Sequence, residues 1–306
     1  MKMTQTIPDY FTFSSEVTQA MQSELPIVAL ESAVITHGLP YPENLTLARD
    51  VESEIRSYQA LPATIAVLDG KIHIGLTGAE LERLSQEKNV RKISRRDFAI
   101  AIAENGNGGT TVAGTLIAAR EAGIRVFSTG GIGGVHRNAP FDISADLPEL
   151  SHSAMIVVCA GAKAILDLPA TLEYLETVGV PVIGYQTDEF PAFYSRQSGL
   201  KVNARASSPQ EIVAIAKAHW GLGLCSAILV VNPPPAEVAL PREEIEAIIQ
   251  VAVKDAETQA VHGAAVTPFL LNRVNELSGG ASLKTNLALL RNNARLGAQI
   301  AVALSH

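Results

Sequence analysis

The spacing of hydrophobic residues predicts strands that alternate with helices. Short runs that are almost continuously apolar are typical of strands buried on both faces of a sheet. Such runs lie at residues 27–30, 125–128, 155–160, 181–185 and 227–231. Two further runs, 64–68 and 71–76, are joined by Asp69-Gly70 and predict a β-hairpin.

Amphipathic helices are expected between these strands. The clearest begins near Pro241, because Glu243 and Glu244 occupy its first turn and apolar residues recur every three or four positions. The other predicted helices start near residue 43 or cover about 78–88, 110–122, 170–178, 209–218, 268–277 and 283–304. This alternation predicts a three-layer α/β/α fold with a mostly parallel central sheet. We expect one domain over residues 1–306, with 1–10 as a flexible tail.

Composition narrows the class of protein. Hydrophobic residues make up 47% and charged residues 18%, enough for a sizeable core. The net charge of −7 argues against a nucleic-acid binder. Cys159 and Cys225 form no Cys-x-x-Cys pair, which argues against a disulfide framework and a thiolate zinc site. The N-terminus has no apolar secretory run, and no stretch is long enough for a membrane span, so we expect a cytoplasmic protein.

Ligands of parallel sheets collect at the carboxyl ends of the strands, and two chemically active residues follow such ends. Glu31 comes directly after the first strand and could exchange protons, although a solvated strand end explains it slightly better. Lys163 follows the apolar run 155–160. Apolar surroundings favour the uncharged amine, which is a nucleophile. A lysine that simply leaves the strand end for solvent fits equally well.

Several polar or glycine-rich segments could bind an anion. Lys92 opens a basic cluster that could hold phosphate or lie on a solvated surface. The glycine run 105–111 enters a helix, which suits either an anion site or a turn with a threonine cap. Four glycines within 130–134 imply close backbone approach to another group. His136, which follows them, is more often structural than catalytic.

A pair of carboxylates and one late polar residue complete the candidates. Asp142 and Asp146 lie four residues apart with Ser144 between them. Their oxygens suit Mn²⁺ or Mg²⁺, although the spacing alone favours a capped helix start. Asn286 lies near the start of the last predicted helix, where N-capping is the simpler explanation.

Taken together, these segments resemble one family: the pseudouridine-5′-phosphate glycosidases, or indigoidine-synthase-A-like proteins. The resemblance covers about residues 10 to 300 in unbroken order. The matching runs are ALES (29–32), THGLPYPEN (36–44), PATIA (62–66), KISRRD (92–97), TTVAGT (110–115), STGGIGGVHR (128–137), FDISADL (141–147), VVCAGAK (157–163), YLETVGVPVIGYQT (174–187), TPFLLNRV (267–274) and SLKTN (282–286).

The resemblance implies a reaction and a role for each candidate residue. The reaction is reversible cleavage of the carbon–carbon glycosidic bond of pseudouridine 5′-phosphate to uracil and ribose 5-phosphate. Lys163 would form an adduct at C1′, Glu31 would donate a proton, and Asp142 would hold a divalent metal, usually Mn²⁺, largely through water. The residues expected to contact substrate are Lys92, Val112, Ser144, Ala145 and Asp146, together with His136 and Asn286.

The resemblance also implies a homotrimer without nucleic-acid or membrane partners, and a separate kinase that would supply the substrate. Two other functions fit the residues. A Schiff-base lyase for another sugar phosphate, such as an aldolase, would share the lysine and the phosphate site. A regulator that binds a sugar phosphate without turnover would share the fold alone. The combination of Glu31, Asp142 and Lys163 argues against the regulator, since a binder needs no activated amine.

Overall fold

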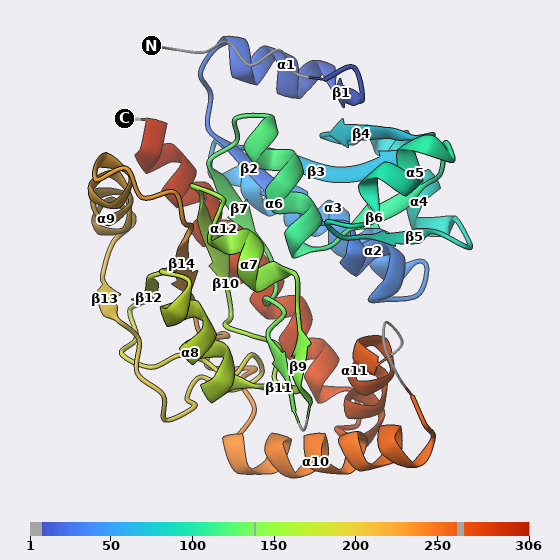
Figure 1. Ribbon diagram of the computed structural model, residues 1–306, viewed down its shortest axis with the longest axis vertical. Coiled ribbons are helices and arrows are strands. Elements are labelled where there is room, and N and C mark those ends of the chain that lie inside the picture. The colour runs from blue at the N-terminus through green and yellow to red at the C-terminus, as the bar shows by residue number, and fades with distance from the viewer. Residues whose placement is uncertain (1–7, 138, 262–265, 306) are drawn as a thin grey trace.

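A large, mostly parallel sheet runs through the molecule, and helices cover both of its faces (Figure 1). The computed structural model describes residues 8–137, 139–261 and 266–305. Within these residues the sheet has 11 strands. Its main path runs β1 (Phe11–Phe13), β4 (Lys71–Ile74), β3 (Leu61–Leu68), β2 (Ile27–Leu30), β7 (Val126–Ser128), β10 (Ile156–Cys159), β14 (Ile228–Val231), β12 (Val182–Tyr185) and β13 (Ala204–Ala206).

Strands β2 and β3 and all strands from β7 to β13 on this path pair in parallel. The predicted hairpin is confirmed, because β3 and β4 are antiparallel and adjacent. Strand β6 (Gly108–Thr110) joins β3 in antiparallel fashion, and β5 (Arg91–Ile93) lies parallel to β6. A separate small sheet contains β11 (Leu166–Asp167), β8 (Val135–His136) and β9 (Ala139–Ile143).

The last helix, α12 (Ala281–Ser305), covers one face of the sheet. It packs on β2, β7 and β10 and beside α3 (Glu43–Ser57) and α9 (Pro209–Gly221). Figure 1 shows α12 behind the sheet, with α6 (Val112–Glu121) and α7 (Asp146–Leu150) in front of it. The remaining helices are α1 (Ser15–Gln22), α2 (Ala33–His37), α4 (Gly78–Gln86), α5 (Phe98–Ala103), α8 (Leu168–Thr177), α10 (Arg242–Thr258) and α11 (Val266–Leu277). The predicted three-layer arrangement is confirmed.

The central strands form the core. Every residue of β10 and β14 is buried, as their uninterrupted apolar sequences predict. Burial of these side chains at about 25 cal/mol per Å² of apolar area is the main stabilising contribution that holds the two helical layers to the sheet. Among the described residues no helix is both long and apolar enough to cross a membrane.

Two segments differ from the sequence-based expectations. The glycine run was expected as a loop, but Gly108 and Gly109 are strand residues in β6. A Cβ at Gly109 would lie 2.2 Å from Thr36 Oγ1, so glycine there permits close packing. Residues 141–143, expected at a helix start, belong to β9, and the helix begins only at Asp146. Residues 1–7 of the expected tail lie outside the described residues, and Phe11 already pairs with β4.

Candidate active site

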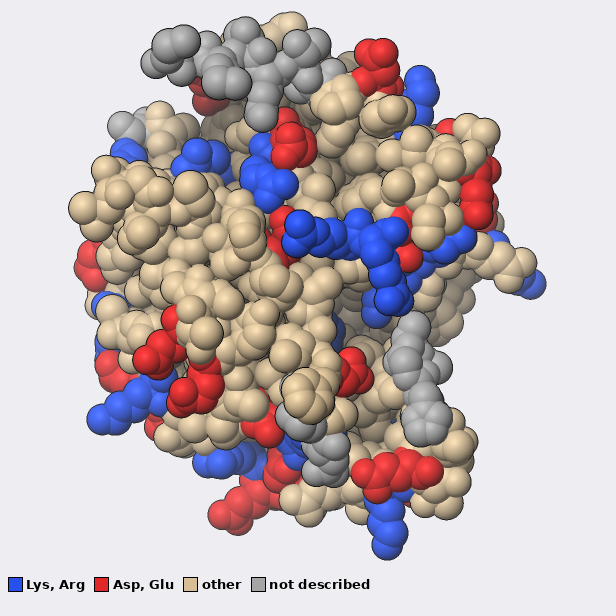
Figure 2. All heavy atoms as spheres, in the orientation of Figure 1, with Lys and Arg blue, Asp and Glu red and all other residues tan. Residues whose placement is uncertain are grey.

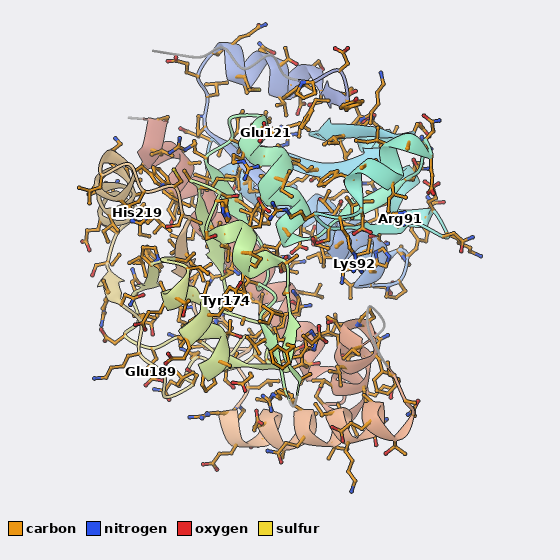
Figure 3. The ribbon with its side chains drawn as sticks, viewed as in Figure 1. Arg91, Lys92, Glu121, Tyr174, Glu189 and His219 are labelled. Atoms are coloured by element: carbon orange, nitrogen blue, oxygen red, sulfur yellow. The ribbon has the colours of Figure 1, made fainter. Side chains whose placement is uncertain are left out.

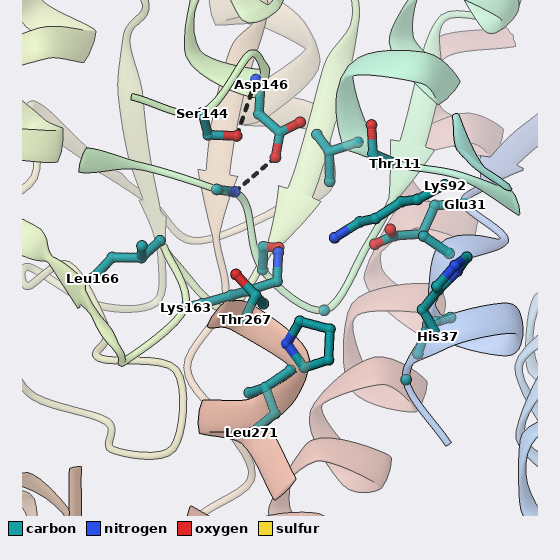
Figure 4. Close-up of a pocket in the computed structure, with 18 of the residues that line it drawn as sticks. Glu31, His37, Lys92, Thr111, Ser144, Asp146, Lys163, Leu166, Thr267 and Leu271 are labelled. Atoms are coloured by element: carbon teal, nitrogen blue, oxygen red, sulfur yellow. Dashed lines mark hydrogen bonds between the residues drawn. The ribbon is translucent and has the colours of Figure 1, made fainter. Parts of the chain in front are cut away.

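A cavity of about 1330 Å³ lies where the carboxyl ends of β2, β7 and β10 meet. This is the edge at which parallel sheets bind ligands. All ten residues proposed from the sequence line it: Glu31, Lys92, Val112, His136, Asp142, Ser144, Ala145, Asp146, Lys163 and Asn286. Figure 4 shows several of them converging on one space from different elements.

The rim of this cavity is basic. Arg95 and Arg96, from the loop after β5, line it together with Lys92. Figure 2 shows Lys and Arg side chains gathered above a hollow on this face of the molecule. In a chain with a net charge of −7, a local positive rim favours an anionic ligand.

Glu31 lies at the end of β2 and lines the cavity, and one oxygen of its carboxyl group is held by a protein hydrogen bond. The hydroxyl of Thr129, which follows β7, donates a hydrogen bond to Glu31 Oε1. Burial raises the pKa of Glu31 above its ordinary value, although the positive charge of Lys163 and the Thr129 hydroxyl partly oppose this effect. The site therefore keeps a carboxyl group that can hold a proton at a higher pH than an exposed glutamate.

The loop after β10 fixes the position of Lys163. Gly161 has φ +86°, a conformation that favours glycine, and a Cβ there would lie 2.3 Å from Pro191 O. The Lys163 backbone N–H donates to Ile132 O at 3.1 Å, and its Nζ donates to Gly131 O at 2.9 Å. The amine is thus held half-buried at the cavity wall, next to the glycine loop that follows β7.

Lys92 provides a second amine to the cavity. Figure 3 shows it beside Arg91 on β5, and the two have different environments. Arg91 is exposed and pairs with Glu104 at 2.9 Å, whereas Lys92 lines the cavity. Burial and then the positive charge of Lys163 lower the pKa of Lys92, while Glu31 and Asp146 oppose the shift. Two lysines and a protonatable carboxyl group therefore share one space.

Asp146 joins two parts of the site. Its Oδ2 accepts the Gly133 N–H and its Oδ1 accepts the Ala113 N–H, each at 2.8 Å. A buried carboxylate that accepts two backbone N–H groups is well satisfied, so Asp146 ties the start of α6 to the glycine loop. Ser144 lies alongside, and its Oγ accepts the Asp146 N–H at 3.2 Å. The carboxylate thereby orders the wall formed by Val112 and Ser144.

His136 and Asp142 form an open edge of the cavity on the small sheet. Their Nδ1 and Oδ2 atoms are 4.0 Å apart, and the Asp142 side chain is 58% exposed. No group of three or more His, Cys, Asp or Glu side chains suited to a metal occurs among the described residues. A cation at Asp142 would therefore need water for most of its coordination sphere, a pattern typical of Mg²⁺ and tolerated by Mn²⁺.

Several residues of the site were not predicted from the sequence. Phe193 and Tyr194 line the cavity from an irregular loop, and no pattern indicated them. Gly131 is a glycine because a Cβ there would lie 2.6 Å from the Phe193 ring. Thr129 and the fully buried Asn293 were also missed. Asn293 had a detectable signal, since it is a polar residue on the apolar side of a predicted helix.

This fold and site define a class: α/β enzymes that hold an amine, a protonatable carboxyl group and a basic rim at one sheet edge. The family model for indigoidine synthase A like protein matches residues 16–303, and the chain belongs to this family. A pseudouridine-5′-phosphate glycosidase of Solibacter usitatus is 57% identical over 94% of this chain and 97% of its own length. One of Geobacillus kaustophilus is 56% identical over 97% and 99%.

Solved structures of related proteins have the same fold. An indigoidine synthase A-like protein from Thermotoga maritima superposes with a TM-score of 0.89 at 38% identity and covers 97% of both chains. The prealnumycin C-glycosynthase AlnA, solved in complex with ribulose 5-phosphate, superposes with a TM-score of 0.90 at 39% identity. That match covers 97% of this chain and 98% of AlnA.

Proposed function

We propose that this protein is a pseudouridine-5′-phosphate glycosidase, which reversibly cleaves the C–C glycosidic bond to give uracil and ribose 5-phosphate. The observation that carries the proposal is the meeting of Lys163 and a half-buried, protonatable Glu31 in one basic-rimmed cavity. Two curated relatives that bear this name are 57% and 56% identical to this chain, and the matches cover nearly their full length. AlnA, solved with ribulose 5-phosphate, supports a sugar phosphate as the ligand class.

The chemistry requires a nucleophile as well as an acid. A C–C glycoside has no leaving oxygen that an acid could protonate, so the two carboxylic acids of ordinary glycosidases are not sufficient. The uncharged Lys163 amine would bond to C1′ while the C1′–O4′ bond breaks, and the proton that the attacking nitrogen then loses would pass to O4′. Glu31 would then protonate the uracil carbon as the C1′–C bond breaks and the lysine nitrogen forms an imine. Water hydrolyses the imine to ribose 5-phosphate and restores the amine.

Uracil release from pseudouridine 5′-phosphate tests the proposal directly. With Mn²⁺ present, chromatography should detect uracil and ribose 5-phosphate in equal amounts. Pseudouridine without its phosphate should react far more slowly, because it lacks the group that the basic rim attracts. Cleavage of an aldol substrate without any release of uracil would instead identify a Schiff-base lyase for another sugar phosphate.

A divalent cation, Mn²⁺ in our proposal, fits the exposed Asp142 carboxylate, which lines the cavity beside His136. A bound cation supplies positive charge for an anionic substrate. We expect EDTA to lower activity at least about tenfold and Mn²⁺ to restore it. Asp142→Asn should weaken Mn²⁺ binding by a similar factor in a titration followed by electron paramagnetic resonance.

Asp188→Asn is the matched control for Asp142→Asn. Its side chain is 75% exposed and pairs with Arg205, and the residue does not line the cavity. Mn²⁺ affinity should therefore match wild type in this variant. Equal Mn²⁺ affinity in Asp142→Asn and wild type would refute the assignment of Asp142 to the metal.

We further propose a homotrimer in the cytoplasm, where phosphorylated nucleosides are retained and a separate kinase can supply the substrate. Phe141 supports an assembly, because its side chain is 98% exposed on β9 beside the cavity and a partner would remove it from water. Light scattering should give three times the chain mass of 32.4 kDa. A mass equal to one chain would contradict the trimer, and recovery of the protein in a membrane fraction would contradict the location.

A further inference from the structure

A buried hydroxyl group holds the Glu31 carboxyl group from behind the cavity wall. Thr129 is only 1% exposed, and its Oγ1 donates to Glu31 Oε1. Its backbone N–H donates to Val158 O at 3.0 Å, which ties the residue to β10. Thr129 therefore contacts the candidate acid without occupying space that a ligand would use.

A pair of buried amides fixes the backbone of Thr129. Asn293, on α12, donates through Nδ2 to Thr129 O at 2.9 Å and to Gly130 O at 3.4 Å. Its Oδ1 accepts from Asn232 Nδ2 at 3.1 Å. Carbonyl oxygens only accept hydrogen bonds, so they dictate which end of the Asn293 amide faces them. Asn232 follows β14 and is 6% exposed, and Asn293 is fully buried.

We propose that Thr129 is a positioning residue for Glu31, and that Asn293 and Asn232 hold Thr129 in place. This inference rests on the proposed function for its meaning, since it assumes that Glu31 is the proton donor. The chain of contacts runs from β14 through α12 and β7 to β2. It joins four elements at the same edge of the sheet, so the orientation of the carboxyl group is set by the core and not by the ligand.

The charged groups around Glu31 determine what loss of the hydroxyl would do. Lys163, after β10, and Lys92, on β5, favour the ionised carboxylate, while Asp146, on α7, opposes it. The Thr129 hydrogen bond also favours the ionised form. Without it, Glu31 should hold its proton to a higher pH than in wild type and should also lose its fixed direction toward the cavity.

Thr129→Val keeps the shape of the side chain and removes only the hydroxyl. We expect kcat for uracil release to fall about tenfold, because the carboxyl group of Glu31 loses a hydrogen bond. KM should change little, because Thr129 makes no contact with the ligand. Thr129→Ser should recover most of this rate. In protein labelled with ¹³C at glutamate carboxyl groups, the Glu31 signal, identified by its loss in Glu31→Gln, should titrate at higher pH in Thr129→Val.

Thr64→Val is the matched control. Thr64 is also a buried threonine, and its hydroxyl donates to the partly buried Glu52, away from the cavity. Thr64→Val should lose about as much stability as Thr129→Val does, but its kcat and its Glu31 titration should match those of wild type. The proposal fails if Thr129→Val titrates Glu31 as wild type does and matches Thr64→Val in kcat.

Asn293→Ala extends the test to the second contact. It leaves Thr129 O and Gly130 O without their buried donor, so we expect the same direction of change with a smaller loss of kcat. If Asn293→Ala does not fold, the comparison of Thr129→Val with Thr129→Ser decides whether the hydroxyl group positions Glu31. The titration needs no turnover: if wild type releases no uracil, the proposed function fails, while the Glu31 signal still shows whether Thr129 controls the carboxyl group.

Discussion

Replacement of Lys163 by alanine is expected to lower uracil release roughly a thousandfold or more, because the reaction loses the amine that bonds to C1′. Few other effects should accompany the change. Among the residues that the structure describes, the Nζ atom makes one hydrogen bond, to Gly131 O at 2.9 Å, at the half-buried cavity wall. Steady-state assays with pseudouridine 5′-phosphate measure the loss, and thermal unfolding checks that the variant is folded. Lys217→Ala, at an exposed site on α9, is the matched control and should keep wild-type activity.

Lys92 is the competing candidate for the nucleophile, because its amine also lines the cavity. Its pKa is lowered by burial, so its uncharged form is more accessible than that of a surface lysine. Lys163 is the better candidate because it follows the central strand β10 on a loop whose backbone is fixed by Gly161. The basic rim of Arg95, Arg96 and Lys92 instead suits the phosphate.

Reductive trapping separates the two lysines. Borohydride added with ribose 5-phosphate should reduce the imine to a stable adduct, and peptide mass spectrometry should place that adduct on Lys163. Lys92→Ala should still be trapped at Lys163, though at higher ribose 5-phosphate concentrations because it lacks a phosphate contact. An adduct on Lys92 in wild type, or more than a tenth of wild-type activity in Lys163→Ala, would overturn the assignment.

Most of the fold followed from local patterns. The buried strands β2, β7, β10, β12 and β14 and the longer helices α3, α4, α6, α8 and α9 were predicted, because an apolar run or an amphipathic pattern marks each of them. The short helices α2 and α5 were not predicted. The three-residue strands β1, β5, β6 and β13 were not predicted. Strand β7 also has three residues, but it belongs to a buried apolar run, whereas these four strands lack such a run and form where a neighbouring strand offers hydrogen bonds. Their existence depends on tertiary contacts, which no local window contains.

The candidate site could also be predicted in part, namely its residues at the ends of strands. Glu31 and Lys163 follow strand ends, and parallel packing places such ends together. The resemblance to a known family gave roles to the other candidates, and all ten line the cavity, whereas the lining residues Phe193 and Tyr194 were not predicted. Thr129 and Asn293 were missed because their importance depends on a contact between residues 164 positions apart. The polar Asn293 on the apolar side of its helix indicates a buried polar group, but the spacing of residues does not show which residue it contacts.

Replacement of Glu31 by glutamine is expected to lower uracil release by about 100- to 10,000-fold, because the amide cannot give a proton to the uracil carbon. Trapping at Lys163 should persist in this variant, since the amine remains. Glu52→Gln is a matched control, because Glu52 is also a carboxyl group with a pKa raised by burial and bonded to a threonine hydroxyl, but it does not line the cavity. Wild-type rates are expected for it, and equal losses in the two variants would point to a general effect of buried carboxyl groups.

The pH dependence gives the same assignment an independent test. A proton donor works in its protonated form, so kcat/KM should fall as pH rises through the pKa of Glu31. Because burial raises that pKa, the fall should occur at a higher pH than an exposed glutamate would give. Removing the positive charge of Lys92, as in Lys92→Met, should move the fall to still higher pH, since that charge favours the ionised carboxylate. In Glu31→Gln the fall of kcat/KM with rising pH should disappear. If the residual activity of this variant still falls as in wild type, another group donates the proton.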